Sequence, residues 1–159
     1  SYAHSVGICH GAISPSKILI SGLSPVLIDF RVDRVHSNYR NPRPLTPLEV
    51  AMQPPERMDH RVMPSPHGDI YSLGAVMFFA LTGRSPISGE TVQDVVRNVK
   101  SEVPPKVASV VLDCPVWVST VVQHSLEKDP QSRPHDAKAF VMELTEARNC
   151  SSGLSSVTE

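Results

Sequence analysis

The chain has 159 residues, of which 40% are hydrophobic and 5% aromatic, and its formal net charge is −1. This length suits one domain with a sizeable core, while the near-neutral charge and the few aromatic side chains argue against binding nucleic acid or an anionic membrane. No apolar run reaches the roughly 20 residues of a membrane span, and no signal peptide is visible. The cysteines Cys9, Cys114 and Cys150 have no metal-ligand spacing, which predicts a cytoplasmic protein with reduced thiols.

The first thirty residues predict a helix end followed by a hairpin. The stretch "SYAHSVG" looks like a last helical turn that stops at Gly7, so we expect that a preceding segment is absent from this chain. The apolar runs "KILI" and "VLIDF", separated by "SGLSP", are typical of a buried hairpin. His10, Lys17 and Asp29 lie at or near the ends of these runs, where polar groups often belong to a site.

A Pro-rich loop and a buried helix are expected next. Seven prolines lie between Pro42 and Pro66, which predicts that residues 31–66 are stiff and irregular rather than helix or sheet. In "GDIYSLGAVMFFALTG" the apolar residues cover every side of a helix, so this helix must be buried all round. We expect Asp69 as its N-cap and Gly83 as its C-terminal stop.

Three further helices follow, in "ETVQDVVRNVK", "CPVWVSTVVQHSL" and "RPHDAKAFVMELTEAR". Thr91 is the expected cap of the first, and Pro115 is expected in the first turn of the second. Their expected apolar faces are Val92, Val95, Val96 and Val99; Val118, Val121, Val122 and Ser125; and Ala137, Phe140, Val141 and Leu144. The Ser-rich tail over 149–159 is expected to be disordered. The fold class predicted is mainly α, one helical lobe with a small β-hairpin.

Five segments, in this order, resemble the motifs of protein kinases. "YAHSVGICHGAISPSKILI" resembles the catalytic loop H-R-D-L-x-x-x-N, "LIDFR" resembles D-F-G, and "QPPE" resembles A-P-E. "DIYSLGAVMFFALTG" resembles the central helix of the larger lobe, and "LEKDPQSRP" the arginine-bearing segment near its end. "LTGRSPISGET" is most similar to bacterial Ser/Thr kinases of the eukaryotic type. The resemblance implies a kinase-like C-terminal lobe over 1–148 and a tail over 149–159.

The same resemblance implies that parts of a kinase are absent or changed. The Gly-rich loop, strand lysine and helix glutamate of the smaller lobe have no counterpart, so we expect that lobe to be absent from this chain. Ala12 stands where the family carries the proton-accepting aspartate, and Gly11 where it carries the preceding arginine. Ser14 replaces the catalytic-loop lysine. Lys17 replaces the metal-binding asparagine, and an ammonium group cannot ligate a cation.

Asp29 is the chemical position that remains, because it matches the metal-binding aspartate of D-F-G. It is interpreted either as a residual magnesium ligand or as one half of an ion pair with Lys17, and we adopt the ion pair. Leu19, beside Ile18, matches the floor under the adenine ring and is either a nucleotide contact or a plain core residue. No cofactor is assigned: ATP is the nucleotide that the family implies, and only Asp29 is left for magnesium.

Five residues match structural positions of the family. His10 and Phe30 match members of an internal apolar column, and a buried core histidine is favoured over a catalytic base. Asp69 resembles the carboxylate that accepts hydrogen bonds from the catalytic-loop backbone. Glu56 and Arg133 resemble a buried ion pair that clamps the loop to the last helices.

Together these positions predict a pseudokinase, a catalytically impaired protein Ser/Thr kinase-like domain that acts as a regulatory or protein-interaction scaffold. A protein partner is expected, with the "TVQDVVRNVK" helix as docking face by analogy, and neither nucleic acid nor a membrane span; the oligomeric state is unknown. The alternative is a weak ATP-dependent serine/threonine kinase that phosphorylates protein hydroxyls and takes its N-terminal lobe from sequence absent here. A third reading is a remnant without a role of its own.

Overall fold

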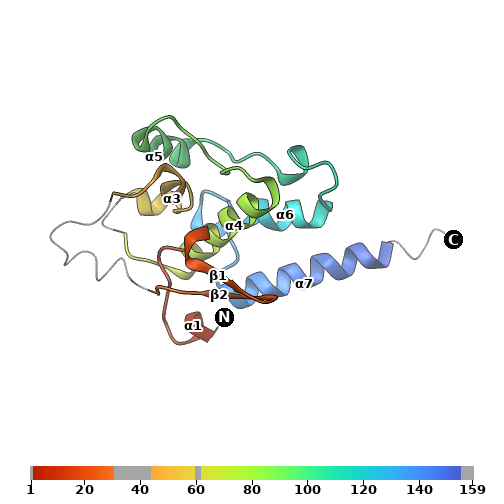
Figure 1. Ribbon diagram of the computed structural model, residues 1–159. Coiled ribbons are helices and arrows are strands. Elements are labelled where there is room, and N and C mark those ends of the chain that lie inside the picture. Colours follow the sequence, from red (N-terminus) through yellow and green to blue (C-terminus); the bar gives the residue numbers. More distant parts are fainter. Residues whose placement is uncertain (1, 31–43, 60–61, 155–159) are drawn as a thin grey trace.

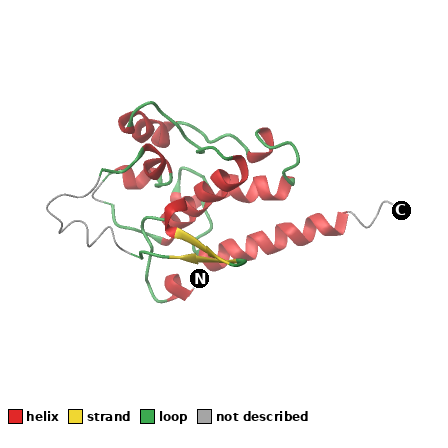
Figure 2. Ribbon diagram, in the orientation of Figure 1, coloured by secondary structure: helices red, strands yellow, loops and turns green. Residues whose placement is uncertain are grey.

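The computed structural model describes residues 2–30, 44–59 and 62–154, which form a helical lobe with one two-stranded antiparallel sheet (Figure 2). This confirms the predicted fold class. Helix α4 runs through the middle of the lobe, with α3 and α5 toward one end and α6 and α7 toward the other (Figure 1). The elements are α1 (Tyr2–Ser5), β1 (Ile18–Ser21), β2 (Ser24–Leu27), α3 (Pro47–Ala51), α4 (Pro66–Thr82), α5 (Val92–Ser101), α6 (Val116–Ser125) and α7 (Ala137–Leu154). Across the described ranges, no helix has the length and apolar character needed to cross a membrane.

Helix α4 begins four residues earlier than the sequence predicted. The side chain of Ser65 accepts a hydrogen bond from the backbone N–H of Gly68, and Pro66 occupies the first helical position. Asp69 is therefore not the N-cap: it lies one turn inside the helix, where its carboxylate is available to distant donors. The predicted stop is confirmed, because Gly83 has a left-handed φ of 68° that ends the helix.

The core surrounds most of α4, but the helix is not buried all round as predicted, because Ala80 and Leu81 near its C-terminal end are exposed. One cluster joins α4 to α6 through Tyr71, Ala75, Phe78, Val122 and Leu126. A second joins α3 and α5 through Val50, Ala51, Ile87, Val95 and Val99, and a third joins α4, α6 and α7 through Ile70, Val121 and Phe140. The lobe is thus held together mainly by burial of apolar side chains against one central helix.

Gly74 is the point of closest approach between α4 and α6. A Cβ atom at this position would lie 2.6 Å from the Cβ of Ser125, too close for two carbon atoms. We expect Gly74→Ala to lower the free energy of unfolding by about 1–3 kcal/mol, although alanine favours the helix itself. Urea denaturation measures the loss. Gly68→Ala is the matched control in the same helix, because its nearest contact would be a milder 3.3 Å; an equal loss in both variants would contradict the prediction.

The hairpin forms as predicted, but it is not buried. Strand β1 pairs with β2 in the register Ile18↔Leu27 and Leu19↔Val26, and only Ile18 and Leu27 pack against the core. A two-stranded sheet offers one face to the lobe, so the side chains on the other face stay in solvent. Leu19 is 52% exposed and Val26 46% exposed, which makes the interpretation of Leu19 as plain core wrong for this chain.

The Pro-rich region contains helical turns that the sequence analysis did not predict. Helix α3 starts with a capping box in which Thr46 and Glu49 exchange side-chain and backbone hydrogen bonds, and Pro47 suits its first turn. A 3₁₀ helix follows over Pro55–Met58. Residues 31–43 and 60–61 of this predicted loop lie outside the described residues.

The last three helices match their predictions except at particular positions. Thr91 caps α5 as expected, and Pro115 is the N-cap of α6 rather than part of its first turn. On α7, Phe140 is buried but Val141 is 56% exposed, because the helix presents a narrower face to the lobe than expected. Helix α7 continues through 149–154, so that part of the expected tail is helical; the domain limits 1–148 and 149–159 otherwise stay a prediction.

Candidate functional site

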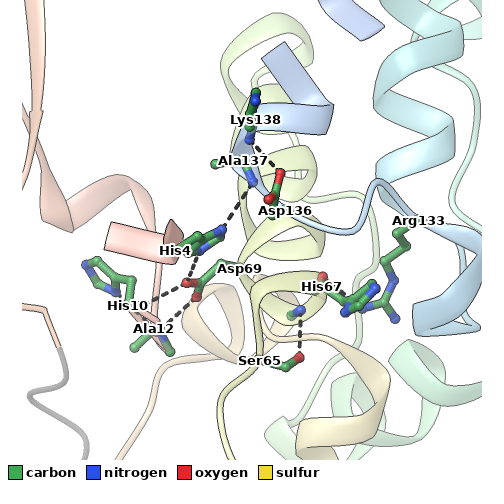
Figure 3. A network of polar contacts seen from close by, with 12 residues as sticks. His4, His10, Ala12, Ser65, His67, Asp69, Arg133, Asp136, Ala137 and Lys138 are labelled. Carbon is green, nitrogen blue, oxygen red and sulfur yellow. Dashed lines mark hydrogen bonds and ion pairs between the residues drawn. The ribbon is translucent and has the colours of Figure 1, made fainter. Parts of the chain in front are cut away.

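A buried carboxylate on α4 holds the loop that follows α1. The side chain of Asp69, which is 4% exposed, accepts hydrogen bonds from the backbone N–H groups of His10 at 2.7 Å and Gly11 at 2.8 Å (Figure 3). Each N–H binds a different carboxylate oxygen. Charged acceptors make stronger hydrogen bonds than neutral ones, so this single side chain fixes the backbone just before Ala12.

His4 is a further part of this network that the sequence analysis missed. Its Nδ1 accepts a hydrogen bond from the backbone N–H of Ala137 at 3.1 Å, so the proton of the neutral ring is on Nε2, which lies 3.0 Å from Oδ2 of Asp69. The ring therefore links α1 to the first turns of α4 and α7 (Figure 3). Its partners are 65 and 133 residues away in sequence, and its spacing from His10 matches no ligand pattern, so sequence alone offered no signal.

His10 is buried, and both its ring nitrogens are used. Its Nε2 donates to the carbonyl oxygen of Ile28 at 2.8 Å, and its Nδ1 accepts from the backbone N–H of Ala12 at 3.2 Å. The ring also packs on Phe30 with 4.8 Å between centroids, although Phe30 is 43% exposed. A histidine bound in this way supports the loop and has no free nitrogen with which to accept a substrate proton.

The loop positions that would carry the chemistry hold few reactive groups. Ala12 offers only a methyl group. Ser14 is buried, and its hydroxyl lies 3.0 Å from the hydroxyl of Ser16, at the start of the 3₁₀ helix Pro15–Lys17. A serine hydroxyl is a weak base, so this loop brings no ionised acceptor to the position after Gly11.

The predicted ion pair between Lys17 and Asp29 is wrong. The structure describes both residues, and their side chains form no ion pair with each other. Asp29 is exposed and has a left-handed φ of 63°, while Lys17 is half-buried. Water solvates an exposed carboxylate well, and an exposed ion pair adds little stability, so nothing forces these two groups together.

The described residues also fit magnesium poorly. They include no group of three or more His, Cys, Asp or Glu side chains that could hold a metal ion. Asp29 is one carboxylate, and the matching second position is the ammonium of Lys17, which repels a cation. Magnesium prefers several oxygen ligands in a near-octahedral arrangement, so we derive no step through a metal here.

A buried ion pair joins the segment after α3 to the segment before α7. Both terminal nitrogens of Arg133 lie 2.9 Å from the carboxylate oxygens of Glu56, and the guanidinium lies 4.9 Å from the centre of the Tyr71 ring. Burial raises the pKa of Tyr71 well above its ordinary value. The remaining partners of Arg133 are the carbonyl oxygens of Glu127, His67 and Lys128, at 2.7, 3.1 and 3.0 Å. The guanidinium therefore loses no hydrogen bond by being buried.

A groove of about 580 Å³ is lined by residues of α3, of the segment after it and of α5, and is called the α3–α5 groove below. Its walls are mainly apolar and include Leu45, Val50, Met58, Val92 and Val96. A further apolar hollow, of about 270 Å³, lies behind the hairpin near His4 and His10. The α3–α5 groove includes the helix that the sequence analysis named as a docking face.

A central buried helix, a loop held by a carboxylate on that helix, and a buried Glu–Arg clamp together define a protein-kinase-like helical lobe. The family model for protein tyrosine and serine/threonine kinases matches residues 1–143. This match covers most of the chain, and the chain therefore belongs to the protein kinase family.

The chain is similar to several bacterial kinases over short parts of their length. It is 28% identical over 144 residues to the probable serine/threonine-protein kinase PkwA of Thermomonospora curvata, covering 90% of this chain and 19% of PkwA. The serine/threonine-protein kinase PknK of Mycobacterium tuberculosis is 29% identical over 150 residues, which cover 92% of this chain and 13% of PknK. PknA of the same organism is 28% identical over 145 residues, which cover 87% of this chain and 32% of PknA. The chain thus spans less than a third of each relative.

Proposed function

We propose that this chain is a catalytically impaired kinase-like domain, a pseudokinase, that acts by binding protein. The observation that carries the proposal is Ala12 at the position of the proton-accepting aspartate. In protein kinases that aspartate orients and deprotonates the substrate hydroxyl. An alanine side chain has no acceptor, and neighbouring His10 has both ring nitrogens engaged.

The scaffold around this position supports the same proposal. The contacts of Asp69 and Arg133 fix the loop and the clamp without using any group that would react with a phosphate. Lys17 and Ser14 stand where the family carries a metal ligand and a phosphate-contacting lysine. A lobe that keeps its frame and lacks these groups is suited to presenting a surface, and the proposal assigns the partner to the α3–α5 groove because its walls are mainly apolar.

A phosphotransfer assay on the full-length polypeptide tests the proposal. We expect no transfer of labelled phosphate from ATP and magnesium to a general protein substrate, and no magnesium-dependent rise of Tm with ATP. The double variant Ala12→Asp, Lys17→Asn restores the two family side chains, and a gain of about 100-fold or more over the wild type would support the proposal, since a positioned base contributes this much.

The weak-kinase alternative predicts a different result in this assay, because it needs the Asp29 carboxylate as a magnesium ligand. Transfer by the wild-type protein that Asp29→Asn abolishes would overturn the proposal and favour a kinase with an unusual base. Asp113→Asn is the matched control, since Asp113 is an exposed carboxylate on the connection between α5 and α6. If Asp29→Asn and Asp113→Asn both abolished transfer, the signal would depend on surface charge and not on Asp29. Such a signal would not be evidence of kinase activity.

A further inference from the structure

His4 holds the first turn of α7 to α1, and the proposed function makes no use of its proton chemistry. A backbone N–H can only donate, so Nδ1 of His4 must be unprotonated where it accepts from Ala137 at 3.1 Å. Ala137 is the first residue of α7, and the N–H groups of a first helical turn have no acceptor within the helix. His4 therefore supplies, from α1, an acceptor that the start of α7 lacks (Figure 3).

Carboxylates face His4 from both of the elements that its ring joins. On α4, Oδ2 of Asp69 lies 3.0 Å from Nε2 of His4, whose side chain is only 9% exposed. At the start of α7, Asp136 interacts electrostatically with His4 and lies 3.6 Å from the exposed ring of His135. The neighbouring His10 directs its own ring nitrogens elsewhere, to backbone groups of its loop and of the hairpin. A protonated His4 would therefore keep an anionic partner in Asp69.

A second proton on His4 acts differently on its two contacts. The neutral ring carries its proton on Nε2, so the added proton goes to Nδ1. An Nδ1–H cannot accept from the N–H of Ala137, and the positive charge lies at the unfavourable end of the α7 dipole. The contact between Nε2–H and Asp69 becomes an ion pair with a charge-assisted hydrogen bond, which is stronger. Protonation therefore keeps α1 on α4 and releases the first turn of α7.

A second histidine holds α7 in the opposite way. Nδ1 of His124 on α6 lies 2.8 and 2.9 Å from the two carboxylate oxygens of Glu143 on α7. A carboxylate only accepts, so Nδ1 carries the proton of the neutral ring and a second proton goes to Nε2. The hydrogen bond to Glu143 is then kept, and an exposed ion pair is added to it. Acid therefore does not break the contact between α6 and α7.

We propose that His4 is a pH-sensitive contact between α1 and α7, formed by the neutral ring and broken by a second proton. Histidine is the side chain that gains or loses a proton between about pH 5 and pH 8, so the contact responds to mild acid. When it breaks, α7 stays attached through Glu143 and through Phe140 in the core. The change is confined to the first turn of α7, and it does not depend on the proposed function.

Amide hydrogen exchange in the full chain tests the release. Rates are measured at about pH 7.5 and pH 5.5, and each is divided by the rate of an unstructured peptide at the same pH to give a protection factor. We expect the protection of the Ala137 amide to fall at least about fivefold at the lower pH, because its acceptor is lost. The amides of His10 and Gly11, which Asp69 accepts, should change by less than about twofold. Unchanged protection of Ala137, or an equal loss at all three amides, would overturn the proposal.

The ring signals of His4 test whether this histidine is the cause. Nitrogen-15 NMR of the imidazole follows the proton on Nδ1 directly in the wild-type protein. We expect the protonation of Nδ1 and the loss of Ala137 protection to have the same midpoint pH. A His4 ring that stays neutral down to about pH 5, or a midpoint that follows His124 or His135 instead, would contradict the proposal.

Two variants separate His4 from the other histidine on α7. Glutamine takes up no proton in this range, so in His4→Gln the protection of Ala137 should not depend on pH, whether or not the new side chain reaches both partners. His124→Gln is the matched control, because it removes a histidine that also contacts α7. We expect it to leave the pH dependence at Ala137 as in the wild type. A pH dependence that survives in His4→Gln, or disappears in His124→Gln, would show that His4 is not the group that responds.

Discussion

We expect Arg133→Met to lower the free energy of unfolding by about 3–5 kcal/mol. The side chain of Arg133 is fully buried, and its removal leaves the carboxylate of Glu56, only 19% exposed, without its cation. It also leaves three backbone carbonyl oxygens without their donor. Methionine fills part of the volume but donates no hydrogen bond. Urea denaturation followed by far-UV circular dichroism measures the loss.

Arg97→Met is the matched control, since Arg97 also forms an ion pair with a carboxylate, that of Asp94. That pair is exposed, with Arg97 71% accessible, and the pKa of Asp94 is lowered first by the Thr91 hydroxyl and only later by Arg97. We expect the free energy of unfolding to change far less than in Arg133→Met, because an exposed ion pair contributes little stability. Similar losses in the two variants would show that burial of the Glu56–Arg133 pair does not decide its contribution.

Elements whose signals are local could be predicted from the sequence. Helix α5 is the clearest case, because Thr91 and Asp94 form a capping box within four residues and the valines that follow repeat at helical spacing. Helix α3 was missed although Thr46 and Glu49 form the same motif. The surrounding prolines predict irregular structure, but a proline in the first helical turn is favourable.

Features that depend on distant neighbours could not be predicted in the same way. The motif order indicated that Asp69 and the catalytic-loop backbone would meet, yet nothing in the spacing pointed to His4 as a second partner. The exposure of Leu19 depends on what covers the outer face of the hairpin, and an apolar strand sequence contains no information on that. Lys128 is a similar case. Its Nζ donates to the carbonyl oxygen of Val99 at 2.7 Å, and its neighbours in sequence do not reveal this contact.

The contacts that hold the candidate site are independent of the groups that would react. Asp69 binds backbone N–H groups, and His10 binds a backbone carbonyl and a backbone N–H. Such contacts tolerate replacement of the side chains at positions 12 and 17, because none of them uses those side chains. Under the proposed function, replacement of the chemical side chains therefore costs the fold little, and a kinase-like lobe can keep its shape with Ala12 in this loop.

Asp69→Asn tests this dependence on the backbone directly. We expect the free energy of unfolding to fall by about 3–5 kcal/mol, because an amide can accept through only one of its two terminal atoms. The new NH₂ group must face one of the N–H donors of His10 and Gly11 or the Nε2–H of His4, and two donors repel each other. Chemical denaturation measures the loss. The amides of residues 10–12 should also exchange faster with solvent.

Asp136→Asn is the control for this second prediction. The carboxylate of Asp136 accepts hydrogen bonds from the backbone N–H groups of Lys138 and Ala139 at the start of α7, and the Ala139 N–H is the main cause of its lowered pKa. Asparagine caps helices about as well as aspartate, so we expect a loss below about 1 kcal/mol. If Asp69→Asn cost no more than Asp136→Asn, the loop would owe its position to packing of His10 against Phe30 and not to the buried carboxylate.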